Sequence, residues 1–254
     1  MWRWPTVQAQ KDKNAKAKSK VNTLHAKLIS LAAEKWADLS LNSNLADIVS
    51  NAKKDGVTAD VIERAIKRGA GLDKVAAKVE EIYYEWYAPG GVAIVLRALT
   101  DNRNRTAPSI RHIFSAFGGN MAESGAVTGF AFDFVGLIKI APGADIEALE
   151  MAIMDTDALD YSLDELTVTT TRENLLTVKK ALEAAGQIIE SAMLAYIPKN
   201  YIPVTDFDQA LKLYSMLDAF EDEEDTEIVW NTADISETLW KEVQEYVESK
   251  RFRT

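Results

Sequence analysis

The lysine and arginine side chains of the N-terminal part are the residues of this sequence best suited to chemistry, and that chemistry is phosphate binding. Seven of them lie before residue 28, where Asp12 is the only acid. A cation at helical spacing neutralises one phosphate of a nucleic acid, in a contact that ignores base sequence and weakens with salt. The alternative is that these side chains only solvate helices. Because two basic faces occur in the same part, we expect phosphate contacts from Lys13, Lys16, Lys20, Lys27, Arg64, Lys67 and Arg68.

A second candidate group lies between a buried strand and a helix. Residues 91–96 are apolar on both faces, and from Ile110 apolar residues recur at i, i+3, i+4 and i+7, which predicts a strand followed by a helix. Thr106 is expected to cap that helix, so that the arginines before it lie on a loop at its N-terminus, where a phosphate can bind. An Asx-rich loop with solvated arginines is an equally good interpretation of this segment alone. The second patch comprises Arg103, Arg105 and Arg111.

Catalytic residues are scarce in this sequence. His25 and His112 are the available imidazole bases, and neither has a nucleophile or a metal-ligand partner at a recognisable spacing. The phosphate-loop, dinucleotide-binding and nucleophile-elbow motifs do not occur, and there is no cysteine for a disulfide or a thiolate metal site. We therefore expect a protein that is not an enzyme and that carries no cofactor and no metal.

A run of five acids occupies residues 221–225. Its default interpretation is a solvated loop, since consecutive acids rarely converge on one ion. A Mg²⁺ site or a site for a basic protein is the less favoured interpretation.

Net charge is −10, but it is unevenly distributed. Residues 1–80 hold 15 Lys and Arg against 9 Asp and Glu, whereas residues 81–254 hold 14 against 30. This asymmetry indicates that a polyanion binds at one end only, while the acidic body could bind basic proteins. No apolar run approaches the roughly 20 residues of a membrane span, and the N-terminus has no apolar signal region. We expect a cytoplasmic protein, with the mitochondrial matrix as the alternative and no membrane partner.

Hydrophobic periodicity predicts helices first and then a mixed region. Residues 11–70 are expected to form three short helices, the last capped by Thr58. Strands are predicted at 82–87, 91–99, 126–134, 136–141, 166–171, 188–196 and 227–231. Helices are predicted near 145–154, 175–185 and 206–219, followed by a C-terminal amphipathic helix from Ile235 that docks on the body. The pattern by itself predicts an α+β protein with more than one unit, and two interleaved βαββαβ units account for the order.

Several ordered motifs resemble those of the YebC family. They are IERAIKRG at 62–69, YEWYAPGGV at 84–92, TDNRNRT at 100–106, RHIF at 111–114, GGN at 118–120, IPKN at 197–200 and NTADI at 231–235. The chain departs from the family pattern at Trp86 and Ala88, where glycines are common, and at Phe117, where histidine is common. It also carries MWRWP at residues 1–5 in place of the usual GHSKWANIKH segment.

The resemblance implies an N-terminal three-helix bundle followed by two ferredoxin-like α/β units, the second inserted in the first. The implied domains are a basic helical bundle over 1–80, a discontinuous α+β domain of 81–135 plus 200–232, an inserted ferredoxin-like domain over 136–199, and a C-terminal amphipathic helix over 233–254. Members of the family are described as DNA-binding transcriptional regulators and as ribosome-associated translation factors that relieve stalling at proline-rich stretches.

We expect a nucleic-acid-binding regulator, with the ribosome and its rRNA favoured over promoter DNA. Lysine-rich helices suit the backbone of structured RNA, and no helix offers a row of base-reading side chains. A protein-interaction scaffold that binds basic ribosomal proteins through the acidic body is the alternative from another class. Reversal of Lys16 and Lys20 to Glu is expected to weaken polyanion binding and to leave the thermal transition almost unchanged.

Overall fold

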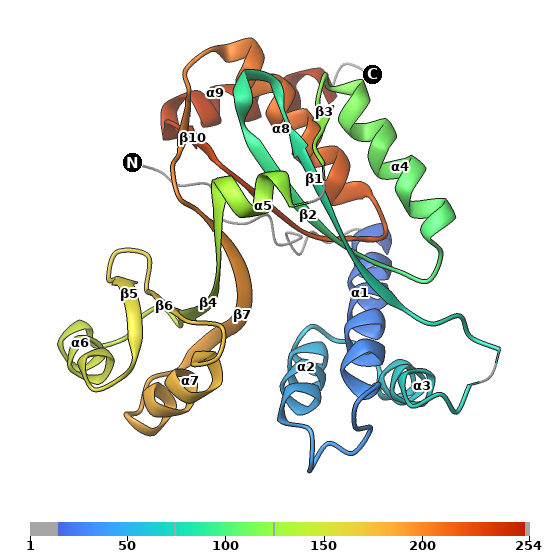
Figure 1. The fold of residues 1–254 in the computed structure, drawn as a ribbon, viewed down its shortest axis with the longest axis vertical. Coiled ribbons are helices and arrows are strands. Elements are labelled where there is room, and N and C mark those ends of the chain that lie inside the picture. The colour runs from blue at the N-terminus through green and yellow to red at the C-terminus, as the bar shows by residue number, and fades with distance from the viewer. Residues whose placement is uncertain (1–14, 74, 124, 252–254) are drawn as a thin grey trace. The chain divides into compact units, whose positions relative to one another are not determined.

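The computed structural model describes residues 15–73, 75–123 and 125–251, and the chain forms two compact units (Figure 1). The first unit comprises residues 1–127 together with 201–254, and the second comprises residues 128–200. None of the helices in the described part of the chain has the length and apolarity that crossing a bilayer requires.

Three helices open the first unit and form a small bundle: α1 (Ala15–Ala33), α2 (Ser43–Lys54) and α3 (Ala59–Gly69). Asn42 caps α2 by accepting a hydrogen bond from the Leu45 amide, and the helices close over Ile29, Val49 and Ile62. At Gly69 a Cβ would overlap the Ser30 carbonyl of α1, so glycine permits the close approach of α1 and α3.

The body of the first unit is a four-stranded antiparallel sheet with the order β3-β1-β2-β9. Its strands are β1 (Glu80–Tyr87), β2 (Ala93–Thr100), β3 (Asn120–Met121) and β9 (Thr226–Asn231), and the short 3-10 turn η1 (Pro89–Gly91) joins β1 to β2. Helices α4 (Arg103–Ala116) and α8 (Phe207–Asp222) share a core with this sheet. Trp86 stacks on Phe114 with ring centroids 4.3 Å apart, so the indole fills the core at one of the positions where the chain departs from the YebC pattern.

A second, smaller pairing completes the first unit. Strands β8 (Ile202–Val204) and β10 (Ala233–Ile235) pair in parallel, and the chain ends in α9 (Glu237–Arg251). The C-terminal helix packs on α8 through Trp240 and Val243, both buried, and the Trp240 ring lies 5.1 Å from that of Tyr214.

The second unit follows a βαββαβ order. It contains β4 (Phe132–Ile140), α6 (Ile146–Met154), β5 (Ala158–Ser162), β6 (Thr167–Thr170), α7 (Leu175–Ala184) and β7 (Ile189–Pro198). The antiparallel sheet has the order β5-β6-β4-β7, which is the ferredoxin-like arrangement. Its core joins Ile138 and Val168 of the sheet to Leu149 of α6 and Leu182 of α7. The predicted class, helices followed by α/β units, is confirmed.

Several local predictions are wrong. Thr58 occupies the N-cap position of α3, but its side chain makes no capping hydrogen bond with a described residue. Residues 126–134 are not one strand, because helix α5 (Ala126–Ala131) precedes β4, and the strand predicted separately at 136–141 is the second half of β4. The carboxylate of Glu85 in β1 accepts hydrogen bonds from the amides of Gly125 and Val127, at 2.7 and 2.8 Å, and so stabilises the first turn of α5. This tertiary contact leaves no sequence signal in residues 126–134 themselves.

Another wrong prediction concerns the start of α4. The cap is Asn102, whose side chain accepts from the Arg105 amide at 3.2 Å, and Thr106 lies inside the helix with its side chain buried. Arg103 and Arg105 therefore belong to the first turn of α4 and do not lie on a loop.

Candidate nucleic-acid interface

The predicted lysines of α1 divide into those that face the body and those without a described side chain. Lys13 lies outside the described residues, and for Lys16 only the backbone in α1 is described. Lys20 and Lys27 lie on one face of α1 with the buried Leu24. Lys20 reaches the C-terminal end of α8, and Lys27 reaches the turn between α8 and β9. The predicted basic stripe of α1 is therefore partly an internal docking face.

Lys27 is buried in an ion pair with Asp225. The two side chains are 5% and 0% exposed, and their charged atoms are 2.5 Å apart. Arg105 adds contacts of 2.9 and 3.0 Å to the two carboxylate oxygens, and the Thr106 hydroxyl donates at 2.5 Å. This Asp225 cluster, defined as Lys27, Thr100, Arg105, Thr106 and Asp225, joins the bundle to the body.

The cluster places an anion of the chain itself where a bound phosphate was expected. Burial by itself would raise the pKa of the Asp225 carboxyl, but hydrogen bonds from Lys27 and Thr106 outweigh it and lower the pKa below its ordinary value. The charged carboxylate lies beside the first turn of α4, where helix geometry favours an anion. Lys27 consequently has no open face for a phosphate in this conformation, and Arg105 has only half of its side chain exposed.

Lys20 docks α1 on the end of α8. Its ammonium donates to the carbonyl oxygens of Glu221 at 2.5 Å and Phe220 at 3.4 Å. Burial lowers the pKa of Lys20 to about 8, although the nearby Glu223, Glu221 and Asp222 act in the opposite direction. A glutamate at position 20 would bring a carboxylate against these carbonyls, so the Lys16 and Lys20 reversal would disturb folding as well as binding.

Contrary to the prediction, the acidic run 221–225 is not a simple solvated loop. Glu223 accepts from the amides of Asp225 and Thr226 at 2.8 and 2.9 Å, and Asp225 is fully buried. The described residues, this run included, contain no group of three His, Cys, Asp or Glu side chains placed to hold a metal ion.

Arg68 extends the junction toward α4. Its guanidinium donates to the Ala77 carbonyl and lies 3.1 Å from Asp101, which is also 3.1 Å from Arg105. Burial would raise the pKa of Asp101, but the hydrogen bond from Arg68 and the charge of Arg105 lower it. Arg68 is 22% exposed, so most of its surface serves this contact.

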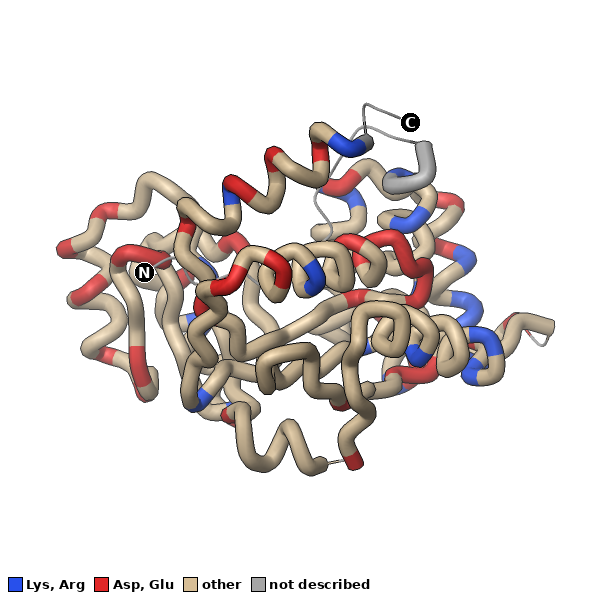
Figure 2. Tube along the Cα trace, turned by 90° about the horizontal axis from the view of Figure 1, so that it is seen from above, with Lys and Arg blue, Asp and Glu red and all other residues tan. Residues whose placement is uncertain are grey.

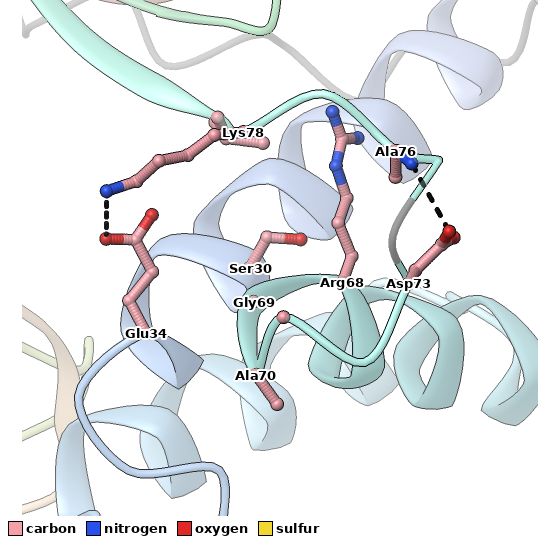
Figure 3. Close-up of a pocket in the computed structure, with 10 residues that line it drawn as sticks. Ser30, Glu34, Arg68, Gly69, Ala70, Asp73, Ala76 and Lys78 are labelled. Atoms are coloured by element: carbon pink, nitrogen blue, oxygen red, sulfur yellow. Dashed lines mark hydrogen bonds and ion pairs between the residues drawn. The ribbon is translucent and has the colours of Figure 1, made fainter.

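A shallow hollow of about 340 Å³ lies beside Arg68, between α1, the end of α3 and the segment that follows it (Figure 3). Figure 3 shows Lys78 and Glu34 facing each other across one side, with their charged atoms 3.1 Å apart. Asp73 on the other side accepts from the Ala76 amide at 3.2 Å. Since Glu34 and Asp73 offset the two cations, the hollow has no net preference for an anion, and we assign it no ligand.

Three predicted cations remain at the surface in ion pairs. Arg64 pairs with Asp60 at 2.5 Å and Lys67 with Glu63 at 2.6 Å, each across one turn of α3. Arg103 pairs with Glu80. Figure 2 shows acidic positions beside basic ones along several helices. Exposed pairs of this kind contribute about 0–1 kcal/mol, so a phosphate can replace the carboxylate at little cost.

Arg111 is the predicted cation that is exposed on α4 and forms no ion pair with a described residue. The bundle carries other cations of this kind, at positions that were not predicted. The exposed cations without an ion pair to a described residue include Lys18, Lys35, Lys53 and Lys54. The last two form the final turn of α2, where their charge complements the helix dipole. The sequence contains one sign of Lys53 and Lys54 as candidates: they form a basic pair directly before the Asp-Gly at 55–56, where the helix ends.

The two histidines do not form a catalytic arrangement within the described residues. His25 Nε2 lies 2.9 Å from an oxygen of Asp55, which links α1 to the end of α2, and His112 is exposed on α4. The first contact has a structural role, because it joins two helices of the bundle.

Two family models match the chain. The model described as "TACO1/YebC protein N-terminal domain" matches residues 2–72, and that described as "TACO1/YebC second and third domain" matches residues 79–233. The N-terminal match begins at residue 2 even though residues 1–5 differ from the usual segment.

Curated relatives and a solved structure agree with these matches. A "Probable transcriptional regulatory protein" of Thermotoga petrophila is 38% identical over 246 residues, which are 95% of this chain and 96% of that protein. A protein of the same description from Proteus mirabilis is 35% identical, over 96% of this chain and 97% of its own. The crystal structure of a conserved hypothetical protein from Aquifex aeolicus has a TM-score of 0.80 and 33% identity, and covers 91% of this chain and 97% of its own.

Proposed function

The chain belongs to the TACO1/YebC family, and we propose that it is a non-enzymatic regulator of gene expression that binds nucleic acid through its N-terminal bundle. Its relatives bear the names of regulatory proteins and not of enzymes. We favour action as a ribosome-associated translation factor that contacts rRNA and helps relieve stalling, for example at proline-rich stretches. Transcriptional regulation by direct DNA binding is the second candidate, and the names of the relatives support it. The bacterial relatives support a cytoplasmic location.

The observation that carries the proposal is the set of exposed cations on the bundle that have no ion pair within the described residues. Lys53 and Lys54 end α2 side by side, and Lys18 and Lys35 lie on α1 and just after it. The structure holds these side chains in place through helices with a common core, so their charge is available to a phosphate without prior loss of an internal contact. Arg64 and Lys67 add positive charge on α3, where each forms only an exposed ion pair with an acid of the same helix.

The composition of the α3 surface supports RNA over a DNA groove. Asp60 and Glu63 are exposed among the cations of α3 and would face phosphates and base edges if this helix entered a major groove. Contacts from dispersed lysines suit the backbone of structured RNA, which is recognised mostly by shape. We therefore assign the bundle to backbone contacts with rRNA.

The decisive experiment compares ribosome co-sedimentation with a promoter-DNA shift at matched salt concentrations. Lys53→Gln with Lys54→Gln is expected to weaken ribosome binding and to reduce the salt slope by about 1 to 2, since two phosphate contacts are lost. Arg64→Gln with Lys67→Gln is expected to have a smaller effect because Asp60 and Glu63 already offset that charge. Lys180→Gln, which removes an exposed lysine of the second unit, is the matched control and is expected to bind normally.

Each outcome distinguishes the candidates. Ribosome association that the Lys53 and Lys54 variant loses, together with weak and salt-fragile DNA binding, supports the translation role. A sequence-selective DNA shift without ribosome association replaces it with the transcriptional role. Normal binding of both nucleic acids by the variant would overturn the assignment of the bundle.

A further inference from the structure

The stretch from residue 140 to residue 171 in the second unit, here named the acidic segment, has an unusual charge pattern. It holds eight Asp and Glu and no Lys or Arg. It includes the whole of α6, β5 and β6. The five Lys and Arg of the second unit all lie outside it, at residues 139, 172, 179, 180 and 199.

Ion pairing in the second unit follows the same boundary. The four acids outside the acidic segment are each paired with a cation at 3.6 or 3.7 Å: Asp133 with Lys199, Glu173 with Arg172, Glu183 with Lys179 and Glu190 with Lys139. In contrast, none of the eight acids of the segment forms an ion pair with a residue that the structure describes. Their negative charge is therefore not offset locally.

Large apolar side chains are exposed among these carboxylates. Met151 and Met154 of α6 are 64% and 70% exposed, and Leu159 of β5 is 60% exposed. The hydroxyl of Tyr161 in β5 donates to Glu150 of α6 at 2.9 Å, which ties the strand to the helix. Methionine adapts its shape to different partners, and grouped exposed apolar side chains with a polar rim are typical of protein interaction sites.

The edge of the sheet is closed to strand addition at this point. β5 is the outer strand of the order β5-β6-β4-β7, but it is only five residues long and carries a bulge between Ala158 and Asp160. The Tyr161 amide donates to the Asp160 carboxylate at 2.9 Å. Short, bulged and charged edges resist pairing with another strand, so a partner must bind through side chains.

We propose that the surface formed by Met151, Met154, Leu159 and Tyr161 docks a basic amphipathic segment of a partner protein. Apolar side chains of the partner would cover the methionines and Leu159, and its lysines or arginines would meet the surrounding carboxylates. Unpaired surface charge of one sign accelerates encounter with the opposite sign and excludes partners of the same sign. This inference is independent of nucleic-acid binding by the bundle.

A nucleic acid is disfavoured at this surface because its phosphates would meet eight uncompensated carboxylates. A second copy docking the same surface on itself is disfavoured by the same repulsion. Both remain as measurable outcomes of the test.

The test uses the full chain and a synthetic amphipathic helix with lysines on one face and leucines on the other. Binding is followed by fluorescence anisotropy of the labelled peptide. Met151→Gln with Met154→Gln is expected to weaken binding about tenfold or more, because the apolar anchors are lost while the charge is kept. Asp157→Asn with Asp164→Asn is expected to weaken it about threefold to tenfold and to reduce its salt dependence. Leu176→Gln removes an exposed apolar side chain of α7 in the same unit and is expected to bind normally.

Circular dichroism establishes that all variants are folded, and a peptide with glutamates in place of lysines is expected not to bind. Equal affinity of the methionine variant and the wild type would overturn the proposal, as would failure of the wild type to bind the basic peptide. A wild-type dimer by sedimentation that the methionine variant loses would assign the surface to a second copy. Loss of binding to protein-free rRNA in the methionine variant would assign the surface to nucleic acid. Either result overturns the protein-partner assignment.

Discussion

Two acid-rich regions of this chain use their carboxylates in opposite ways. Residues 221–225 are a run of five acids in which Asp225 is buried and paired with Lys27 and Arg105. The acidic segment at 140–171 has eight acids, and none pairs with a described residue. The difference arises from which cations reach each region through the fold: α1 and α4 bring theirs to the first, whereas none of the described elements pairs a cation with a carboxylate of the second. Tertiary contacts therefore decide whether an acid-rich region stabilises the fold or leaves its charge exposed for a partner.

Removal of the buried carboxylate of Asp225 is expected to have the largest effect on stability. Asp225→Ala is expected to lower the free energy of unfolding of the first unit by about 3–5 kcal/mol, because Lys27 would be left buried without its partner. Urea unfolding measures it, and tryptophan fluorescence reports the first unit alone because all six tryptophans lie outside residues 128–200. Glu224→Ala, at the exposed neighbour, is the control, with an expected change within about 0.5 kcal/mol. Equal effects of the two would mean that burial does not distinguish these acids.

Removal of the cation is expected to be less severe. Lys27→Met is expected to cost about 2 kcal/mol, since Arg105 and the Thr106 hydroxyl still stabilise the Asp225 carboxylate. The same urea experiment measures it. In a double variant with Asp225→Asn the two costs should not add, because the side chains belong to one network. Additive costs would contradict the pairing.

The stability that Lys20 contributes at the acidic run 221–225 is expected to depend on pH. Its folded-state pKa of about 8 lies below the ordinary 10.5, so between these values the unfolded chain binds more protons than the folded chain. The contribution of Lys20 to stability therefore rises as the pH increases from 8 to 10.5. The difference in unfolding free energy between the wild type and Lys20→Met should increase over that window and be flat below it. A difference that decreases over the window would show that the lysine is not desolvated.

The smallest effect is expected in the acidic segment. Asp157→Asn with Asp164→Asn is expected to change the thermal transition by an amount equivalent to less than about 0.5 kcal/mol, because neither carboxylate holds an ion pair with a described residue. Circular dichroism melting measures it. A stability gain well above that size would show strong mutual repulsion among the carboxylates, and a loss would reveal a structural role.

Much of the fold could be predicted from local patterns. The helices of the bundle, helices α6 and α7 and strands β6 and β7 follow from apolar periodicity, and the family motifs supply the order of units. Strands β3, β5, β8 and β10 escaped prediction because they are only two to five residues long and carry too little periodicity. Helix α5 escaped it because its first turn depends on Glu85, which lies some forty residues earlier in the chain.

The site was less predictable than the fold. Lys20, Leu24 and Lys27 have helical spacing whether they face solvent or an acidic turn, so the stripe on α1 could not reveal that it is buried on the body side. The TDNRNRT motif predicts a phosphate-binding loop, whereas in the structure Thr106 and Arg105 bind the internal anion Asp225. Lys53 and Lys54 were not predicted, because two adjacent cations show no helical periodicity.

The ion pair between Lys27 and Asp225 has a consequence for biosynthesis, since its two residues are 198 positions apart. At a synthesis rate of roughly 5–20 residues per second, about 10–40 s separate their translation. The bundle has a core of its own and can fold as soon as it leaves the ribosomal exit tunnel, but its docking face stays open until the last part of the chain emerges. During that interval the nascent protein exposes lysines that the finished protein conceals.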